Sequence, residues 1–157
     1  MTARRKPVVF LDADVIFAGA AAPTEHGASH VVLRMSEITL IECVTSEQAV
    51  AEVERNLTEK LPAKLPEFHL LVSRCLRVVP DPEPEDLARH TGQADPKDLP
   101  ILVAALREGC PYLLTFNVRH YSPTAGSITM QQPGEFVLAV RDLLTQLSAE
   151  EEVHGTE

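Results

Sequence analysis

The 157-residue sequence has no tryptophan, few aromatic residues (4%) and a shortage of positive charge. It contains 14 Lys and Arg against 23 Asp and Glu, which gives a formal net charge of −9. This balance argues against nucleic-acid binding driven by overall charge, so contact with nucleic acid would need a local basic patch, a metal ion or a partner. No apolar run is long enough to span a bilayer, so we predict no contact with a membrane.

The three cysteines, Cys43, Cys75 and Cys110, are far apart and form no C-x-x-C pair. This spacing argues against a zinc site and predicts reduced thiols in a cytoplasmic protein. Two aspartates interrupt the apolar stretch near the N-terminus, which argues against a secretory signal.

Apolar runs typical of buried strands alternate with segments of helical periodicity, which predicts an α/β fold with a mostly parallel central sheet. The predicted strands are residues 8–12, 38–44, 76–80, 111–116 and 127–132, and the predicted helices are residues 26–37, 45–61, 65–75, 83–91, 98–109 and 134–147. A capping box of Thr45 and Gln48 is expected to begin the second helix. We expect a single domain over residues 1–147 and a disordered acidic tail over 148–157.

The segment "PVVFLDADVIFAG" (residues 7–19) places Asp12 directly after the first strand, with Asp14 two residues later. An unpaired carboxylate is costly where a buried strand ends. Three interpretations therefore compete: a helix cap or turn, the nucleophile of a phosphatase, or a metal ligand. In a parallel sheet, functional sites form beyond the carboxyl ends of the strands, which favours a functional role for Asp12.

Other polar residues at element ends extend this pattern. The helix over residues 45–61 contains several glutamates, and periodicity alone does not choose between Glu52 and Glu54. A helix starting at Asp98 places Pro100 in the first turn, where no amide donor is needed, whereas a start at Asp95 does not. Thr115 and Asn117 follow the fourth strand, and turn formation alone would explain both.

The ordered motifs "LDADVI", "TSEQAVAEVERNL", "DPKDLPILVAAL" and "LLTFNVRHY" resemble those of PIN-domain nucleases, and most closely the toxin-like VapC-type branch. The resemblance covers residues 7 to 147 and implies a three-layer α/β/α fold with four to five strands. It aligns the family's glutamate with Glu52 and its metal-binding aspartate with Asp98.

The resemblance also implies an activity and partners. Asp12, Asp98 and Glu52 would bind Mg²⁺ or Mn²⁺, the hard cations that carboxylate oxygens prefer. Asn117 would orient a water molecule at the metal, and Thr115 would fix the carboxylate of the first strand. The protein would be an endoribonuclease acting on RNA, the toxin of a toxin–antitoxin pair, and a homodimer that binds an antitoxin protein. Because they flank the third and fourth motifs, Lys97 and Arg119 are candidate contacts for the RNA phosphates.

The sequence departs from the family pattern at two positions. Asp14 stands where an Asn is common, and Asn117 stands where many members have a fourth acidic residue, with His120 near the place of another Asp. We therefore expect Asp14 to support the structure rather than bind metal. Two alternatives stay open: a PIN fold that serves as a binding or regulatory module, and a haloacid-dehalogenase-type phosphatase that uses Asp12 and Asp14. The segment "LLTFN" is similar to the second motif of these phosphatases. Their later motifs, a Lys followed by an acidic pair, do not occur after Asn117, which argues against the phosphatase interpretation.

Overall fold

The structure, a computed structural model, describes residues 6–21 and 27–154. Its centre is a five-stranded sheet in the order β3-β2-β1-β4-β5, in which every neighbouring pair of strands is parallel. The strands are β1 (Val8–Leu11), β2 (Glu42–Ser46), β3 (Leu76–Val79), β4 (Tyr112–Leu114) and β5 (Thr129–Gln131). The predicted α/β fold with a mostly parallel sheet of four to five strands is confirmed.

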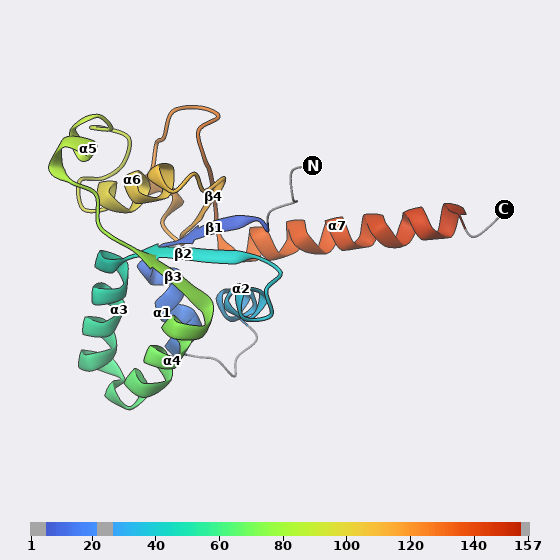
Figure 1. Ribbon diagram of the computed structural model, residues 1–157, viewed down its shortest axis with the longest axis horizontal. Coiled ribbons are helices and arrows are strands. Elements are labelled where there is room, and N and C mark those ends of the chain that lie inside the picture. The colour runs from blue at the N-terminus through green and yellow to red at the C-terminus, as the bar shows by residue number, and fades with distance from the viewer. Residues whose placement is uncertain (1–5, 22–26, 155–157) are drawn as a thin grey trace.

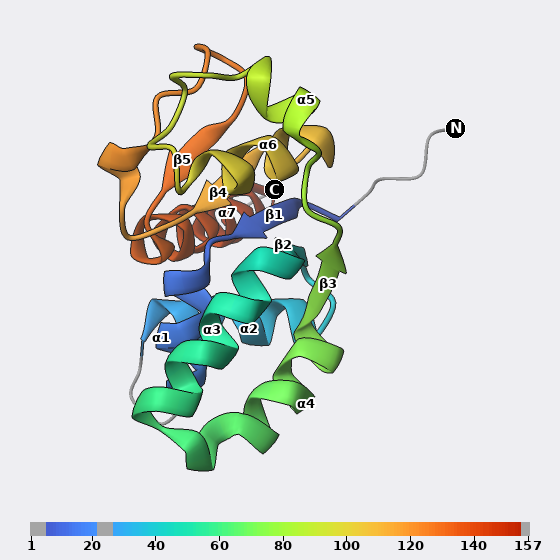
Figure 2. The same cartoon turned by 90° about the vertical axis from the view of Figure 1, so that its left-hand side faces the viewer.

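Helices cover both faces of the sheet. They are α1 (Ala13–Ala21), α2 (Ala28–Glu37), α3 (Glu47–Lys60), α4 (Leu65–Cys75), α5 (Pro84–Ala88), α6 (Leu99–Arg107) and α7 (Pro133–His154), with short 3₁₀ turns at Pro62–Lys64 and Val118–His120. The helices α1 to α4 lie on one side of the sheet and α6 lies on the other (Figures 1 and 2). The resulting α/β/α layers agree with the expected three-layer architecture.

The central strand β1 explains why the first apolar run is continuous rather than alternating. Val9, Phe10 and Leu11 are all fully buried, because helices pack on both faces of the strand. The strand order also changes direction at β1, which has β2 on one side and β4 on the other. Open parallel sheets form their ligand sites beyond the carboxyl ends of the strands at such a reversal. In this chain, that position is occupied by Asp12 and by the residues that follow Leu114.

The start of α3 differs from the prediction. Strand β2 begins at Glu42 rather than at residue 38, after a turn in which Thr39 has a positive φ of 67°. Thr45 therefore lies within the strand, where its hydroxyl donates to the Leu11 carbonyl at 2.8 Å. Ser46 caps the helix instead, since its hydroxyl accepts from the Ala49 amide at 3.2 Å. The predicted capping box of Thr45 and Gln48 is wrong by one residue.

Two further differences concern helices. Helix α1 was not among the predicted elements, because its residues are mostly apolar and therefore show no helical periodicity. Helix α7 continues to His154, so residues 148–154 extend a helix that was predicted to end at residue 147. Alanine and glutamate in this stretch are strong helix formers, which explains the extension. Residues 155–157 of the predicted tail lie outside the described residues.

Helix α7 begins beside α2 and projects away from the rest of the molecule (Figure 1). Three leucines on its outer part, Leu143, Leu144 and Leu147, are about 60% exposed. Within the described ranges, no helix combines the length and the apolar character that crossing a membrane requires.

Candidate active site

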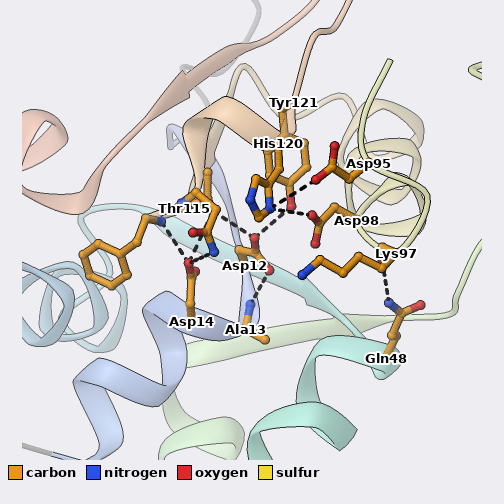
Figure 3. Close-up of polar contacts among 12 residues, drawn as sticks. Asp12, Ala13, Asp14, Gln48, Asp95, Lys97, Asp98, Thr115, His120 and Tyr121 are labelled. Carbon is orange, nitrogen blue, oxygen red and sulfur yellow. Dashed lines mark hydrogen bonds and ion pairs between the residues drawn. The ribbon is translucent and has the colours of Figure 1, made fainter. Parts of the chain in front are cut away.

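Asp12 is a buried carboxylate that accepts hydrogen bonds from three different residues. It lies between β1 and α1 and is only 7% exposed. Its Oδ2 accepts hydrogen bonds from the Thr115 hydroxyl at 2.9 Å and from the Tyr121 hydroxyl at 2.8 Å, and its Oδ1 accepts from the Ala13 amide at 2.7 Å (Figure 3). A carboxylate has about four acceptor positions, so these three bonds fix its orientation and leave one position for a ligand.

Asp14 turns toward the segment after β4. Its Oδ2 accepts from the Phe116 amide at 3.0 Å and from the Asn117 side-chain amide at 3.1 Å. Its Oδ1 is buried without a hydrogen-bond partner in the described part of the chain. Burial, together with the nearby charge of Asp12, raises the pKa of Asp14 to about 6, although the Phe116 amide opposes the shift. Asp14 thus holds backbone in place, at the β4 end rather than in the following turn.

Helix α3 presents Glu52 rather than Glu54 to this site. Burial raises the pKa of Glu52, and the negative charges of Asp12 and Asp98 raise it further, while Arg55 and Lys97 oppose the shift. Glu54 is exposed on another side of the helix, where it lies 3.4 Å from a ring nitrogen of His69. The structure therefore removes the ambiguity that the periodicity of the helix leaves.

Asp98 occupies the N-cap position of α6, where the first-turn constraint of Pro100 places it. Its Oδ2 lies 2.9 Å from Nδ1 of His120, and an Asp95 oxygen lies 3.6 Å from the same nitrogen. Burial raises the pKa of Asp98, the hydrogen bond from His120 opposes this shift, and the charge of Asp12 adds to it. Ligand atoms of Asp95, Asp98 and His120 all lie within 4.8 Å of one another, which is compact enough to hold a metal ion.

The two candidate phosphate contacts occupy different places. Lys97 is exposed beside Asp98, and its side chain extends toward the carboxylates of Asp12 and Asp98 (Figure 3). Its charge lowers the pKa of both Glu52 and Asp98. Arg119 is exposed on the 3₁₀ turn after β4 and lines a separate pocket together with Asn117 and His120.

The donor set fits a hard cation. Burial is the main cause of the raised pKa values of Glu52 and Asp98, and the negative charge of Asp12 adds to the rise at both. A divalent cation held by oxygen ligands removes this repulsion, and each of the three carboxylates keeps an acceptor position free for it. His120 adds a nitrogen donor at the edge of the cluster, which Mn²⁺ tolerates better than Mg²⁺ does.

Three residues of this site were missed or undervalued by sequence reasoning. Tyr121 donates to Asp12 from 109 positions away, and no local signal in the sequence predicts that contact. His120 and Asp95 belong to the compact cluster, but His120 was noted only as a departure from a family pattern and Asp95 only as a helix cap. The presence of His120, Asp95 and Asp98 in the sequence was the signal that could have predicted this cluster.

Two solved structures are similar to the chain in fold. A chain of VapBC2 from Rickettsia felis, solved bound to a DNA fragment from their promoter, is similar with a TM-score of 0.59 at 13% identity, over 80% of this chain and 98% of that chain. A chain of VapBC-1 from nontypeable Haemophilus influenzae is similar with a TM-score of 0.56 at 17% identity, over 81% and 98%. At these identities the similarity shows the fold alone. No curated protein sequence matches the chain.

The PIN domain family matches residues 8–119, which include β1, the whole of α3 and α6, and the segment after β4. The match therefore spans Asp12, Glu52, Asp98, Thr115 and Asn117 in one alignment. It favours a nuclease over the phosphatase that "LDAD" alone left open. On this sequence match and the parallel α/β/α architecture, the chain belongs to the PIN domain family.

Proposed function

We propose that the protein is a metal-dependent endoribonuclease that hydrolyses RNA phosphodiester bonds and holds Mg²⁺ or Mn²⁺ through Asp12, Asp98 and Glu52. One observation carries this proposal. Asp12, fixed by two hydroxyl groups at the reversal point of the sheet, lies close enough to Glu52 and Asp98 to raise the pKa of both. Clustered carboxylates repel one another in a chain with a net charge of −9, and a bound cation would relieve this repulsion.

In the proposed reaction, each residue of the site has a separate role. When bound, the cation neutralises charge on the phosphate and activates a water molecule for attack. Thr115 and Tyr121 hold Asp12 in one orientation, so that its free acceptor position points consistently. Lys97 binds a phosphate oxygen next to the carboxylates. Asn117 directs its amide nitrogen to Asp14, so that its carbonyl oxygen is available to orient the attacking water.

We further propose that the protein is the toxin of a toxin–antitoxin pair that acts in the cytoplasm. The resemblance to VapC-type toxins and the similarity in fold to two structures named VapBC support this role. An antitoxin protein would bind it, and two copies of the chain would form a homodimer. An apolar groove between α7 and the turn before β2 supports a protein partner, and its lining includes Leu40, Val140, Leu143 and Leu144.

The single PIN-like domain over residues 1–147 stays a prediction.

One observation favours the alternative of a binding or regulatory module with weak catalysis. Asn117 stands in place of a fourth acidic residue, and its amide group is engaged with Asp14 rather than with the other carboxylates. In that case the carboxylates would still bind a cation, but RNA would not be cleaved.

The test compares cleavage of a single-stranded RNA oligonucleotide with Mn²⁺ by the wild type, Asp12→Asn and Asp142→Asn. Asp142 is an exposed aspartate of α7 that contacts only its neighbour Arg141 among the described residues, so it controls for the loss of one charge. We expect cleavage by the wild type and by Asp142→Asn, and none by Asp12→Asn. Absent cleavage by all three, with retained Mn²⁺ binding by the wild type, would favour the binding module.

A further inference from the structure

Phe116 is an exposed aromatic side chain directly beside the candidate active site. It is 44% exposed, and it is the only aromatic residue among the strongly exposed large apolar side chains that the structure describes. The hydroxyl of the preceding residue, Thr115, donates a hydrogen bond to Asp12. The backbone amide of Phe116 donates a hydrogen bond to Asp14 at 3.0 Å. Its backbone is therefore fixed by the same carboxylates that form the site, although its ring faces solvent.

A pocket of about 280 Å³ includes Phe116 in its lining. Its lining consists of Phe116, Asn117, Val118, Arg119, His120 and Gln132. Pockets that bind drug-sized ligands have volumes of about 300–1,000 Å³. This smaller pocket therefore suits a single planar group better than a larger molecule. His120 joins the pocket to the carboxylates, because its Nδ1 contacts Asp98 at 2.9 Å.

The pocket also differs in charge from the carboxylates beside it. Arg119 is exposed and makes no ion pair with any other described residue, so its guanidinium group can bind a phosphate. Proteins that bind single-stranded RNA combine these two elements: an aromatic ring on which an unpaired base stacks, and a cation that contacts the backbone.

We propose that Phe116 and Arg119 form the binding site for one nucleotide of single-stranded RNA, adjacent to the phosphodiester at the carboxylates. The base stacks on the Phe116 ring, and Arg119 contacts the phosphate of the same nucleotide. A base within a duplex is already stacked on its neighbours and cannot reach the ring, so the site selects unpaired RNA. This inference rests on the proposed ribonuclease function and deepens it by naming the form of the substrate.

The absence of tryptophan from the chain makes a direct test available. In Phe116→Trp, the new indole is the only tryptophan of the full chain, and a stacked base quenches its fluorescence. The matched control is Leu70→Trp, which places an indole at a 53% exposed position on α4. We expect a single-stranded oligouridylate to quench Phe116→Trp much more than Leu70→Trp, and an RNA duplex to quench neither. Equal quenching of both variants, or equal quenching of Phe116→Trp by the duplex, would overturn the inference.

Kinetics with Mn²⁺ give a second readout. Stacking of one base contributes about 1–3 kcal/mol, so Phe116→Ala should raise KM about 5- to 150-fold with little change in kcat. Phe116→Tyr should retain the wild-type KM because it keeps the ring. A wild type that cleaves RNA with a KM unchanged by Phe116→Ala would refute the nucleotide site and leave the nuclease standing. Selective quenching of Phe116→Trp without cleavage by the wild type would refute the nuclease and leave the nucleotide site standing.

Discussion

Asp14 is hydrogen-bonded to Asn117. Its Oδ2 accepts hydrogen bonds from the side-chain amide of Asn117 at 3.1 Å and from the backbone amide of Phe116 at 3.0 Å. The sequence segments that follow β1 and β4 are thereby joined through one carboxylate. The resemblance to PIN domains places an Asn at position 14 and an acidic residue at position 117. This chain carries the same two chemical groups in exchanged positions, so its negative charge lies deeper in the protein.

The buried charge of Asp14 predicts a pH-dependent stability. Its pKa is raised to about 6, above the ordinary value of 3.8, so the folded state binds a proton more tightly than the unfolded state does. The contribution of Asp14 therefore favours folding below about pH 4 and is lost as the pH rises through about 6. We expect Asp14→Asn, in metal-free protein, to raise the free energy of unfolding at pH 7 on the order of 1 kcal/mol, since partial solvent access reduces the full effect.

Thermal unfolding in EDTA between pH 4 and pH 7.5 measures this difference. The curves for Asp14→Asn and the wild type should approach each other at pH 4 and separate above pH 6. Asp142→Asn controls for charge alone, because Asp142 is an exposed aspartate of α7 whose side chain pairs only with its neighbour Arg141 among the described residues. A difference between Asp14→Asn and the wild type that does not vary with pH would contradict the prediction.

Exchanging the two side chains predicts a non-additive result. Asn117→Asp alone places two carboxylates about where the 3.1 Å hydrogen bond now lies, so it should lower stability at neutral pH. The double variant Asp14→Asn/Asn117→Asp restores an amide–carboxylate pair and moves the charge to an exposed position. We expect it to recover the stability that Asn117→Asp loses and to bind Mn²⁺ more tightly than the wild type. A double-mutant cycle with calorimetric Mn²⁺ titration measures both effects, and additive changes would exclude the pairing.

Glu52 and Glu54 offer a matched comparison on one helix. Glu52→Gln removes a carboxylate whose pKa responds to Asp12 and Asp98, whereas Glu54→Gln removes one that contacts His69. Changes to groups around a metal site cost about 10- to 100-fold in affinity, so Glu52→Gln should shrink the rise in Tm that Mn²⁺ produces. Glu54→Gln should leave this rise unchanged. Equal losses in the two variants would place neither glutamate at the cation.

The hydrogen bond from the Tyr121 hydroxyl helps to orient Asp12, so we expect its removal to slow RNA cleavage. A hydrogen bond to a charged group contributes about 1.5–3 kcal/mol, so Tyr121→Phe should lower RNA cleavage by about 10- to 100-fold. Tyr112→Phe is the control, because Tyr112 packs edge-on against Phe136 and its hydroxyl has no partner among the described residues. Cleavage rates with saturating Mn²⁺ compare the two. Full activity of Tyr121→Phe would show that the Thr115 hydroxyl and the Ala13 amide are enough to position Asp12.

The apolar side of α7 predicts self-association. Leu143 and Leu144 are 61% and 60% exposed and line the groove beside Leu40. Replacing both leucines by Ser should change monomer stability little, because exposed substitutions are usually worth within about 0.5 kcal/mol. The same change should weaken dimerisation in sedimentation velocity, whereas Gln146→Ser on the same helix should not. A wild type that stays monomeric at all concentrations would refute the homodimer.

How far the sequence predicts this site depends on whether a residue's role is local. Asp98 was placed correctly because Pro100 restricts where α6 can begin, which is a rule about one turn of helix. Periodicity left Glu52 ambiguous, because the choice depends on which face of α3 turns toward Asp12 and Asp98, and this is set by tertiary packing. Tyr121 was not found at all, since its partner Asp12 lies 109 residues away and nothing near Tyr121 indicates that contact. Ser46 rather than Thr45 capped α3 because β2 extended further than its apolar residues suggest.

The separation of Asp12 and Thr115 by 103 positions has a consequence for the timing of activity. The strand that carries Asp12 is made early in translation, whereas β4 and Tyr121 leave the ribosome only after most of the chain. Long-range parallel pairing forms late in folding, because the loop between the strands must close first. A nascent or truncated chain therefore exposes Asp12 without its hydroxyl partners. The carboxylate of Asp12 therefore takes up its final orientation only after the sheet has closed around β1.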